Sequence, residues 1–341
     1  MFSHEEIVIR AGQRTGLPII IAIHSTAPGR SGGGCRVNHY ADWRDGLSDA
    51  LRLSQAMTYK CAIAGLDTGG GKTVVALPIG HVFTPDSRRD LLHDVGDVID
   101  SLQGRYVTGP DVGTGPADMA VIKERTPHVV CTPVEMGGCG DSSPATAAGV
   151  MSALHAVCAR LGDGGLKGRR VGLLGLGHVG SHLARHLAEE GAWILAADVD
   201  PGKRALAEDV GASWTGPDEL LGAELDILVP AALGGLLTEE LVPRLRCAAI
   251  AGPANNQIAT PEVAQMLHDR GVLWAPDDIV SAGGAIYAHA VELRRQTPEQ
   301  ADALVAGIGD RLGRVLDRAG RDGVSPYFTA QELVRERLRD R

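Results

Sequence analysis

The chain has 341 residues, of which 44% are hydrophobic and 22% charged. This is the composition of an ordinary globular protein, and it excludes a disordered chain and a collagen-like repeat. The length favours two domains over one. The longest clean apolar run, Leu17–Ile23, is far shorter than the roughly 20 residues of a membrane helix. The acidic N-terminal segment is unlike a signal peptide, so we expect a cytoplasmic protein with no membrane partner.

The charged residues and the cysteines narrow the function classes further. The net charge is −9 and no basic run is present, which argues against nucleic acid as a partner. The six cysteines are scattered without a C-x-x-C pair, which favours reduced thiols over disulfides or a zinc site. Arginine outnumbers lysine by 28 to 5, so each lysine is informative, and Lys60 and Lys72 lie twelve residues apart beside a glycine run.

Apolar spacing predicts the elements of the first third of the chain. The expected strands are residues 17–24, 73–77 and 105–108, and the expected helices are residues 45–61 and 85–102. A long helix over residues 141–160 is expected to leave the first domain, with Asp141 or Ser142 as its N-cap.

From Arg169 onward, strands and helices alternate strictly. The apolar strands are expected within VGLLGLG, WILAADVD, LDILVPAA, CAAIAGPA and GVLWAPD. This alternation predicts an α/β fold with a doubly wound parallel sheet of the Rossmann type. We expect a first domain over residues 1–135 and a dinucleotide-binding domain over residues 136–299. Helices around 298–319 and 330–339 should pack back on the first domain, which residues 300–341 would complete, or on the connecting helix.

A glycine turn in the second domain predicts a dinucleotide site. Gly175, Gly177 and Gly180 form G-x-G-x-x-G after an apolar strand and at the start of a helix. They permit a tight turn, backbone approach to a pyrophosphate and close packing of helix on strand. Asp198 ends the next strand. A carboxylate there would accept hydrogen bonds from the ribose hydroxyls and repel a 2′-phosphate, so NAD is favoured over NADP. Asp200 could share that role, and the alternative is a turn that binds nothing.

Three histidines, His178, His182 and His186, are spaced at i, i+4 and i+8 on the helix after this turn. The spacing would suit a metal, but no carboxylate or thiol at matching spacing completes a site. We therefore interpret them as a solvated helix face and expect no metal.

The two lysines suggest acid–base chemistry. Lys60 ends a predicted helix, and Lys72 follows the glycines of Gly69–Gly71, which we interpret as a turn. A second ammonium and a dry cleft would lower the pKa of Lys72 toward neutrality, as a general base requires. The glycine spacing before Lys72 does not fit a P-loop. The alternative is a pair of surface lysines.

Two further loops carry polar residues of the kind found at active sites. Asp111 lies in a Gly/Pro-flanked turn after a strand, and Asn255 and Asn256 follow a strand of the parallel sheet. Ligands of such sheets bind at the carboxyl ends of the strands. Both features are equally compatible with structural roles, as solvated or capping carboxylates and as turn asparagines.

Seven segments occur in one order: GGCR, MTYK, GLDTGGGKT, GPDVGT, GLGHVG, AGPANNQ and APDDIVSAGGAI. Together they resemble the Glu/Leu/Phe/Val amino-acid dehydrogenase family, on its leucine and phenylalanine dehydrogenase branch, over nearly the whole chain. The resemblance implies reversible NAD-dependent oxidative deamination of an L-amino acid to a 2-oxo acid and ammonia. It also implies a substrate-binding and oligomerising first domain, a cleft between two domains, and a homodimer or larger homo-oligomer.

The resemblance also implies residue roles. Lys72 matches the catalytic lysine, Asp111 the acid that works with it, and Lys60 the lysine that binds the substrate carboxylate. Asn256, with Asn255 as the alternative, matches an asparagine that holds the substrate. The matching backbone turn beside the carboxylate is formed by Gly33 and Gly34. The expected cofactor-binding residues are Gly175, Gly177, His178, Val179, Gly180, Thr146, Asp198 and Asn256.

Departures from the family pattern bear on the substrate. Gly32, Gly109, Ala285 and Ala288 all withhold side-chain volume at positions that match the substrate pocket. Because an empty apolar hole is costly, a bulky occupant such as phenylalanine or tryptophan is favoured over leucine or valine. Ser281 replaces the usual asparagine before A-G-G, which affects how the cofactor is placed.

Two alternative functions remain beside an aromatic amino-acid dehydrogenase. One is a branched-chain dehydrogenase, and the other is a non-catalytic NAD-binding regulator on the same fold. The retention of Lys60, Lys72 and Asp111 favours an enzyme, because burying ionisable groups together is costly without a use.

Overall fold

The computed structural model describes residues 3–27, 29–162, 164–232 and 234–339. Its contacts divide into two compact units. The first unit holds the chain up to Asp141, then Ala288–Gln296, and the residues from Glu336 on. The second holds Ser142–Tyr287 and Thr297–Arg335. Within the described residues, no helix is both long enough and apolar enough to cross a membrane.

The first unit is built on a mixed five-stranded sheet with the strand order β1-β2-β4-β3-β5. The strands are β1 Glu6–Ala11, β2 Pro18–Ile23, β3 Ser31–Tyr40, β4 Gly69–Pro78 and β5 Tyr106–Pro110. β3 is parallel to both β4 and β5, whereas β2 is antiparallel to β1 and β4. A crossover through helix α1, Trp43–Ala64, connects β3 to β4.

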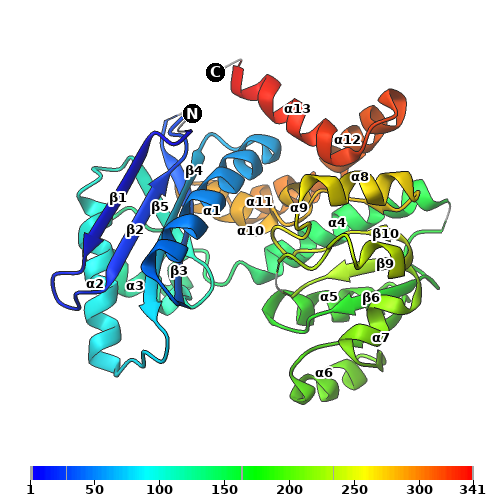
Figure 1. The fold of residues 1–341 in the computed structure, drawn as a ribbon, viewed down its shortest axis with the longest axis horizontal. Helices are drawn as coiled ribbons and strands as arrows, with labels where there is room; N and C mark the ends of the chain where they lie inside the picture. Colours follow the sequence, from blue (N-terminus) through cyan, green and yellow to red (C-terminus); the bar gives the residue numbers. More distant parts are fainter. Residues whose placement is uncertain (1–2, 28, 163, 233, 340–341) are drawn as a thin grey trace. The chain divides into compact units, whose positions relative to one another are not determined.

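Helices cover both faces of this sheet (Figure 1). α1 packs against β4, where Val74 and Ala76 form an apolar cluster with residues of β2 and α1. The other face carries the larger core, built with residues of α2, Pro85–Asp100, and α3, Pro116–Lys123. Because side chains alternate along a strand, Lys72 lies on the α1 face with Val74 and Ala76.

The second unit is a six-stranded parallel sheet with the strand order β11-β10-β9-β6-β7-β8. The strands are β6 Arg170–Leu174, β7 Trp193–Ala197, β8 Ser213–Trp214, β9 Glu224–Pro230, β10 Arg246–Ile250 and β11 Leu273–Trp274. The helices include α4 Ser143–Leu161, α5 His178–Glu189, α6 Arg204–Asp209, α7 Pro217–Gly222, α8 Pro261–Asp269, α9 Asp277–Val280 and α10 Gly283–Ala288. The predicted two-domain α/β fold with a doubly wound sheet is confirmed.

The C-terminal helices correct one expected boundary. They are α11 Pro298–Ala306, α12 Ile308–Asp322 and α13 Pro326–Arg339. α11 and α12 pack on the connecting helix α4, and α12 buries Ile308, Leu312 and Val315. Residues 297–335 therefore belong to the second unit. The expectation that residues 300–341 complete the first domain is wrong for all but the last residues, and packing on the connecting helix is what the structure shows.

Two expected glycine turns are strands. Gly33 and Gly34 lie within β3, and Gly69–Gly71 begin β4. A Cβ atom at Gly33 would overlap the Gly71 carbonyl oxygen on the neighbouring strand. Glycine in a strand interior often marks such a close backbone approach. The glycines therefore allow two strands to pack tightly, where the sequence had suggested a turn.

Candidate active site

A charged cluster around the buried Lys72 lies on three adjacent strands of the first unit. The Lys72 Nζ on β4 is 2.9 Å from Asp111 Oδ2, just after β5. The same carboxylate oxygen accepts a hydrogen bond of 2.8 Å from Arg36 Nε on β3. The structure therefore brings Lys72 and Asp111 together, as the sequence predicts, and adds an arginine to them.

Gly34 is the residue that leaves room for this cluster. A Cβ atom there would lie 2.7 Å from Asp111 Cβ and 3.3 Å from Lys72 Nζ. The loop of Asp111 is held from the other side by Thr114, whose hydroxyl accepts from the Asp111 N–H at 3.0 Å and donates to the Cys35 carbonyl at 2.7 Å. The missing side chain at Gly34 and the bonded loop together fix where the carboxylate meets the ammonium.

Burial and neighbouring charges shift the pKa values of the pair. Lys72 is 5% exposed, and burial lowers its pKa, with Arg36 and Lys60 acting in the same direction and Asp111 opposing them. Burial alone would raise the pKa of Asp111, but Lys72 and Arg36 hold it at about 2. The carboxylate is thus charged at neutral pH, and the ammonium loses its proton more easily than an ordinary lysine.

Lys60 reaches the same region from the last turns of α1. It is 8% exposed, and its charge acts on Lys72. Close packing of α1 on β4 makes this possible, because a Cβ atom at Gly70 would lie 2.5 Å from Thr58 Oγ1 of the helix. The two lysines that stood out in the sequence are therefore buried neighbours, and the interpretation as surface lysines is wrong.

Arg36 and Asp49 are the charged residues that the sequence analysis missed. Arg36 Nη1 pairs with Asp49 Oδ2 at 2.8 Å, and the Tyr40 hydroxyl donates to the same oxygen at 2.8 Å. The sequence feature that could have identified Arg36 is its spacing from Gly34, because residues two positions apart on a strand lie on the same face of the sheet. That spacing is informative only once β3 is known to be a strand.

The second unit carries the predicted dinucleotide turn. Gly175 has a φ of 106°, which only glycine adopts readily. Gly177 precedes α5 as its N-cap residue, and a Cβ atom at Gly180 would overlap the Gly175 carbonyl group. His178 is exposed and Val179 half-buried, both in the first turn of α5. Gly175 and Gly180 thus have the structural roles that the motif predicts, a tight turn and close packing of the helix on the strand.

Asp198 follows β7 and braces this turn. Its Oδ2 accepts from the Leu176 N–H at 2.6 Å, and its Oδ1 accepts from the Asp200 N–H at 2.9 Å. Asp200 instead accepts from the Gly202 N–H at 2.8 Å and caps a short 3-10 helix. Of the two candidate acids, Asp198 is the one bonded to the glycine turn. Thr146, in the first turn of α4, donates its hydroxyl to the Ser142 carbonyl at 2.9 Å.

The asparagine loop is fixed by α9. Asn256 has a φ of 53°, a left-handed conformation that asparagine tolerates, and its N–H donates to Asp277 Oδ2 at 2.6 Å. Ser281 donates to the Asp277 carbonyl at 2.6 Å and lies 3.3 Å from Asn255 Oδ1. Ser281 therefore supports the asparagine loop from the end of α9.

The four positions proposed to widen the pocket differ from one another. At Gly32 an added Cβ would meet only Thr68 Cβ, at 4.0 Å, so the space there is open. At Gly109 it would lie 3.3 Å from Val130 Cγ2, so that glycine relieves tight packing instead of opening space. Ala285 belongs to the second unit, and Ala288 begins the returning segment of the first.

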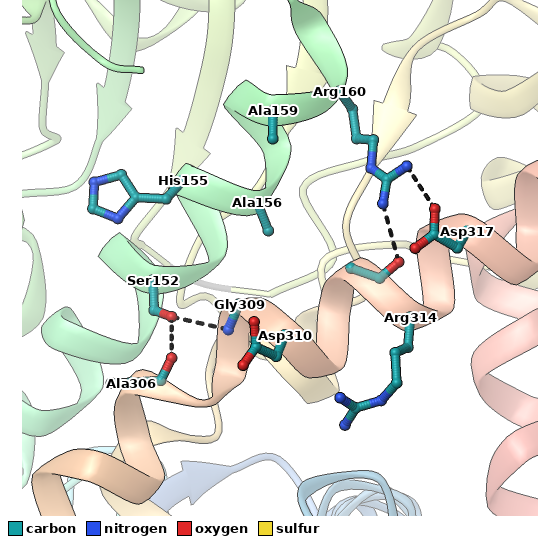
Figure 2. A pocket seen from close by; sticks show the side chains of 11 residues that line it. Ser152, His155, Ala156, Ala159, Arg160, Ala306, Gly309, Asp310, Arg314 and Asp317 are labelled. Carbon is teal, nitrogen blue, oxygen red and sulfur yellow. Dashed lines mark hydrogen bonds and ion pairs between the residues drawn. The ribbon is translucent and has the colours of Figure 1, made fainter. Parts of the chain in front are cut away.

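A groove elsewhere in the second unit contains none of the predicted residues (Figure 2). It lies between α4 and α12 and includes an ion pair of 2.7 Å between Arg160 Nη1 and Asp317 Oδ1. Ser152 of α4 donates to the Ala306 carbonyl of α11 at 2.5 Å. These bonds join α4 to α12 and to α11, and they give the groove a structural explanation.

The chain matches known families over most of its length. Residues 2–128 match the dimerisation domain of Glu/Leu/Phe/Val dehydrogenases, and residues 202–300 match the Glutamate/Leucine/Phenylalanine/Valine dehydrogenase domain. Leucine dehydrogenase of Thermoactinomyces intermedius is 38% identical over 99% of this chain and 91% of its own. Valine dehydrogenase of Streptomyces virginiae is 41% identical over 99% of this chain and 94% of its own.

Relatives named for aromatic amino acids are about as similar to this chain as the leucine and valine dehydrogenases. Phenylalanine dehydrogenase of Caldalkalibacillus thermarum is 38% identical over 99% of this chain and 92% of its own. The crystal structure of L-tryptophan dehydrogenase from Nostoc punctiforme is 35% identical, covers 99% of this chain and 96% of its own, and has a TM-score of 0.81. The chain therefore belongs to the Glu/Leu/Phe/Val dehydrogenase family, on its leucine and phenylalanine branch, and is an amino-acid dehydrogenase.

Proposed function

We propose that the protein interconverts an L-amino acid with a bulky apolar side chain and its 2-oxo acid, using NAD and releasing ammonia. The observation that carries the chemistry is the buried Lys72 amine at 2.9 Å from the Asp111 carboxylate. Replacing an amine by a carbonyl group consumes a water molecule, which must lose protons as it adds to carbon. Lys72, with its lowered pKa, is the base for that water.

The other polar groups have distinct roles in this proposal. Asp111 stays ionised and holds the Lys72 ammonium in place after the proton has moved. Lys60 binds the substrate carboxylate as a buried cation. Asn256, or Asn255 beside it, holds the substrate near its reacting carbon. NAD supplies the hydride acceptor when it is bound.

NAD is proposed over NADP on the basis of Asp198. Its carboxylate is bonded to the glycine turn, and its negative charge would repel a 2′-phosphate. Asp198→Ala should raise the KM for NADH while narrowing the preference for NADH over NADPH, because the favourable ribose bonds and the repulsion are lost together. Steady-state rates with both nucleotides measure this. A wild-type enzyme that prefers NADPH contradicts the proposal.

A large side chain is proposed for the substrate on the basis of the open space at Gly32. The test is NADH consumption with ammonium and a panel of 2-oxo acids: phenylpyruvate, indolepyruvate, 4-hydroxyphenylpyruvate, 4-methyl-2-oxopentanoate, 3-methyl-2-oxobutanoate and 2-oxoglutarate. The aromatic acids should give the highest kcat/KM. Gly32→Leu should shift the preference at least about tenfold toward the smaller acids, because the added side chain fills that space.

The panel also separates the alternatives. A kcat/KM about tenfold higher for 4-methyl-2-oxopentanoate than for phenylpyruvate would keep the chemistry and favour a branched-chain dehydrogenase. Lys72→Ala should lower kcat by about 10²–10⁴-fold and leave the NADH Kd unchanged. A wild-type protein that binds NADH but turns over none of the acids would favour the non-catalytic regulator.

We also propose that the protein works as a homodimer or larger homo-oligomer with small-molecule substrates. The support is the match of residues 2–128 to a domain described as a dimerisation domain. Light scattering coupled to gel filtration measures the mass directly, and a monomer at micromolar concentration contradicts this proposal.

A further inference from the structure

Two thiols and a carboxylate meet in the first unit, outside the groups assigned above. Cys131 and Cys139 flank a short 3-10 helix, Val134–Met136, and Glu292 lies on a π-helix, His289–Leu293. The two sulfur atoms are 3.5 Å apart. One ligand atom from each of the three residues lies within 4.8 Å of the other two.

Glu292 is held in place by the backbone next to both sulfurs. Its Oε1 accepts hydrogen bonds from the Cys131 N–H at 2.6 Å and the Cys139 N–H at 3.0 Å. The side chain is 8% exposed, and no ion pair joins it to a lysine or arginine in the described part of the chain. A buried carboxylate with neutral partners only is an attractive site for a cation.

We propose that Cys131, Cys139 and Glu292 bind one thiophilic divalent cation of the zinc class. With Zn–S bonds of about 2.3 Å, tetrahedral geometry separates two sulfur ligands by about 3.8 Å. The observed 3.5 Å is close to that separation. The carboxylate is the third ligand, and a solvent molecule can complete four-coordination, since Cys139 is half-buried. Both thiols release a proton to solvent as the cation binds, and no electrons are transferred.

The same geometry favours a metal over a disulfide. The sulfur atoms are 3.5 Å apart, which is close to their separation in a tetrahedral site and far from an S–S bond of about 2 Å. The Glu292 carboxylate beside the two cysteines supplies a negative charge that attracts a divalent cation and has no role in a disulfide.

The three ligands come from the two stretches where the chain passes between the units. Cys139 lies two residues before the boundary at Asp141, and Glu292 is in the returning stretch Ala288–Gln296. A bound cation would cross-link these stretches within the first unit. Cys131 has a φ of 59°, a strained conformation for a residue with a side chain, so the local structure fixes this thiol at a cost. This proposal departs from the sequence expectation of no metal, because a search for C-x-x-C spacing cannot reveal two cysteines eight residues apart with a distant glutamate.

The test is a cobalt titration of the full chain after chelator treatment. We expect one Co²⁺ per chain with a sulfur-to-cobalt charge-transfer band, displaced by Zn²⁺. Cys139→Ser and Glu292→Gln should each weaken Co²⁺ binding at least about tenfold. Cys158→Ser changes a buried cysteine outside the cluster and should leave the binding unchanged.

Glu292→Gln keeps an oxygen that can accept the two N–H bonds, so it tests the charge in a folded protein even if Cys139→Ser fails to fold. Circular dichroism checks the fold of each variant. The proposal is overturned if the wild type binds no stoichiometric Co²⁺, or if both ligand variants bind it as tightly as wild type. It is equally overturned if peptide mapping finds a Cys131–Cys139 disulfide in the freshly purified protein.

Discussion

Arg36 and Asp111 act on the Lys72 amine in opposite directions. Burial and, to a smaller extent, Arg36 favour the neutral amine, whereas Asp111 favours the charged ammonium. Arg36 also bonds to Asp111 and so shares the carboxylate charge with Lys72. The pKa of the base is therefore set by burial, by the charge of Asp111, and by the opposing charges of Arg36 and Lys60.

This balance predicts opposite pH shifts for two substitutions. If Lys72 is the base, kcat/KM for deamination rises with pH as Lys72 loses its proton, at a pH below the ordinary lysine range. Asp111→Asn removes the charge that favours the ammonium, so the rising limb should move to lower pH. Arg36→Gln removes a charge that disfavours it, so the limb should move to higher pH.

Full pH–rate profiles of both variants measure these shifts. Arg89→Gln breaks an exposed ion pair with Glu124 in the same unit and serves as the matched control, with an unshifted limb expected. Shifts of both variants in the same direction would mean that Lys72 is not the titrating group.

At this scale the sequence predicted the lysines and Asp111 but not their neighbours. Lys60, Lys72 and Asp111 stood out through the scarcity of lysine and through family resemblance. Arg36 lies in the quoted segment GGCR, yet arginine is common in this chain. Its partner Asp49 is thirteen residues away on α1. Only the assignment of β3 and α1 as neighbours brings the two together.

At the scale of elements, the glycine-rich strands β3 and β4 determine how closely the charged residues can approach. Helix bounds were predicted to within a few residues, as in α1, α2 and α4. β3 was missed because its SGGGC run lacks the branched and aromatic residues that mark a strand. Glycine is required in this strand by tertiary packing, because the backbone of the neighbouring strand leaves no room for a side chain at Gly33.

Gly34→Ala should therefore lower kcat by about 10²-fold, because a displacement of about 1 Å in a catalytic group has that effect. The new methyl group would lie 2.7 Å from Asp111 Cβ and 2.8 Å from the Pro110 carbonyl oxygen, so the carboxylate must move from Lys72. Steady-state kinetics with the preferred 2-oxo acid measure this loss.

Gly320→Ala is the matched control for the same change. Gly320 lies exposed in α12 with nothing within 4 Å of an added Cβ. The substitution should keep the wild-type kcat and raise the free energy of unfolding by about 0.5–1 kcal/mol, the helix preference of alanine over glycine. A Gly34→Ala enzyme with wild-type kcat would show that the strand can adjust without moving the acid.

At the scale of the whole molecule, each structural unit is assembled from segments that are separated in the sequence. The chain leaves the first unit at α4, returns for Ala288–Gln296, and then adds α11 and α12 to the second unit. The alternation of strands and helices predicted the parallel sheet well, because such elements are recognised from local periodicity. The same pattern could not assign the C-terminal helices to a unit, since the sequence of an amphipathic helix shows which face is apolar but not which surface covers that face.

Hydrogen exchange on a reciprocal pair of core variants tests this assignment. Leu312 of α12 and Leu91 of α2 are both 0% exposed, and truncation of either to alanine should cost about 2–5 kcal/mol. Because local opening follows the cooperative unit that loses stability, Leu312→Ala should lower amide protection in β6 and β9 and spare β2 and β4. Leu91→Ala should do the reverse. If Leu312→Ala lowers protection in β2 and β4 as much as in β6 and β9, the C-terminal helices stabilise both units, and the boundary inferred from residue contacts does not describe how the protein unfolds.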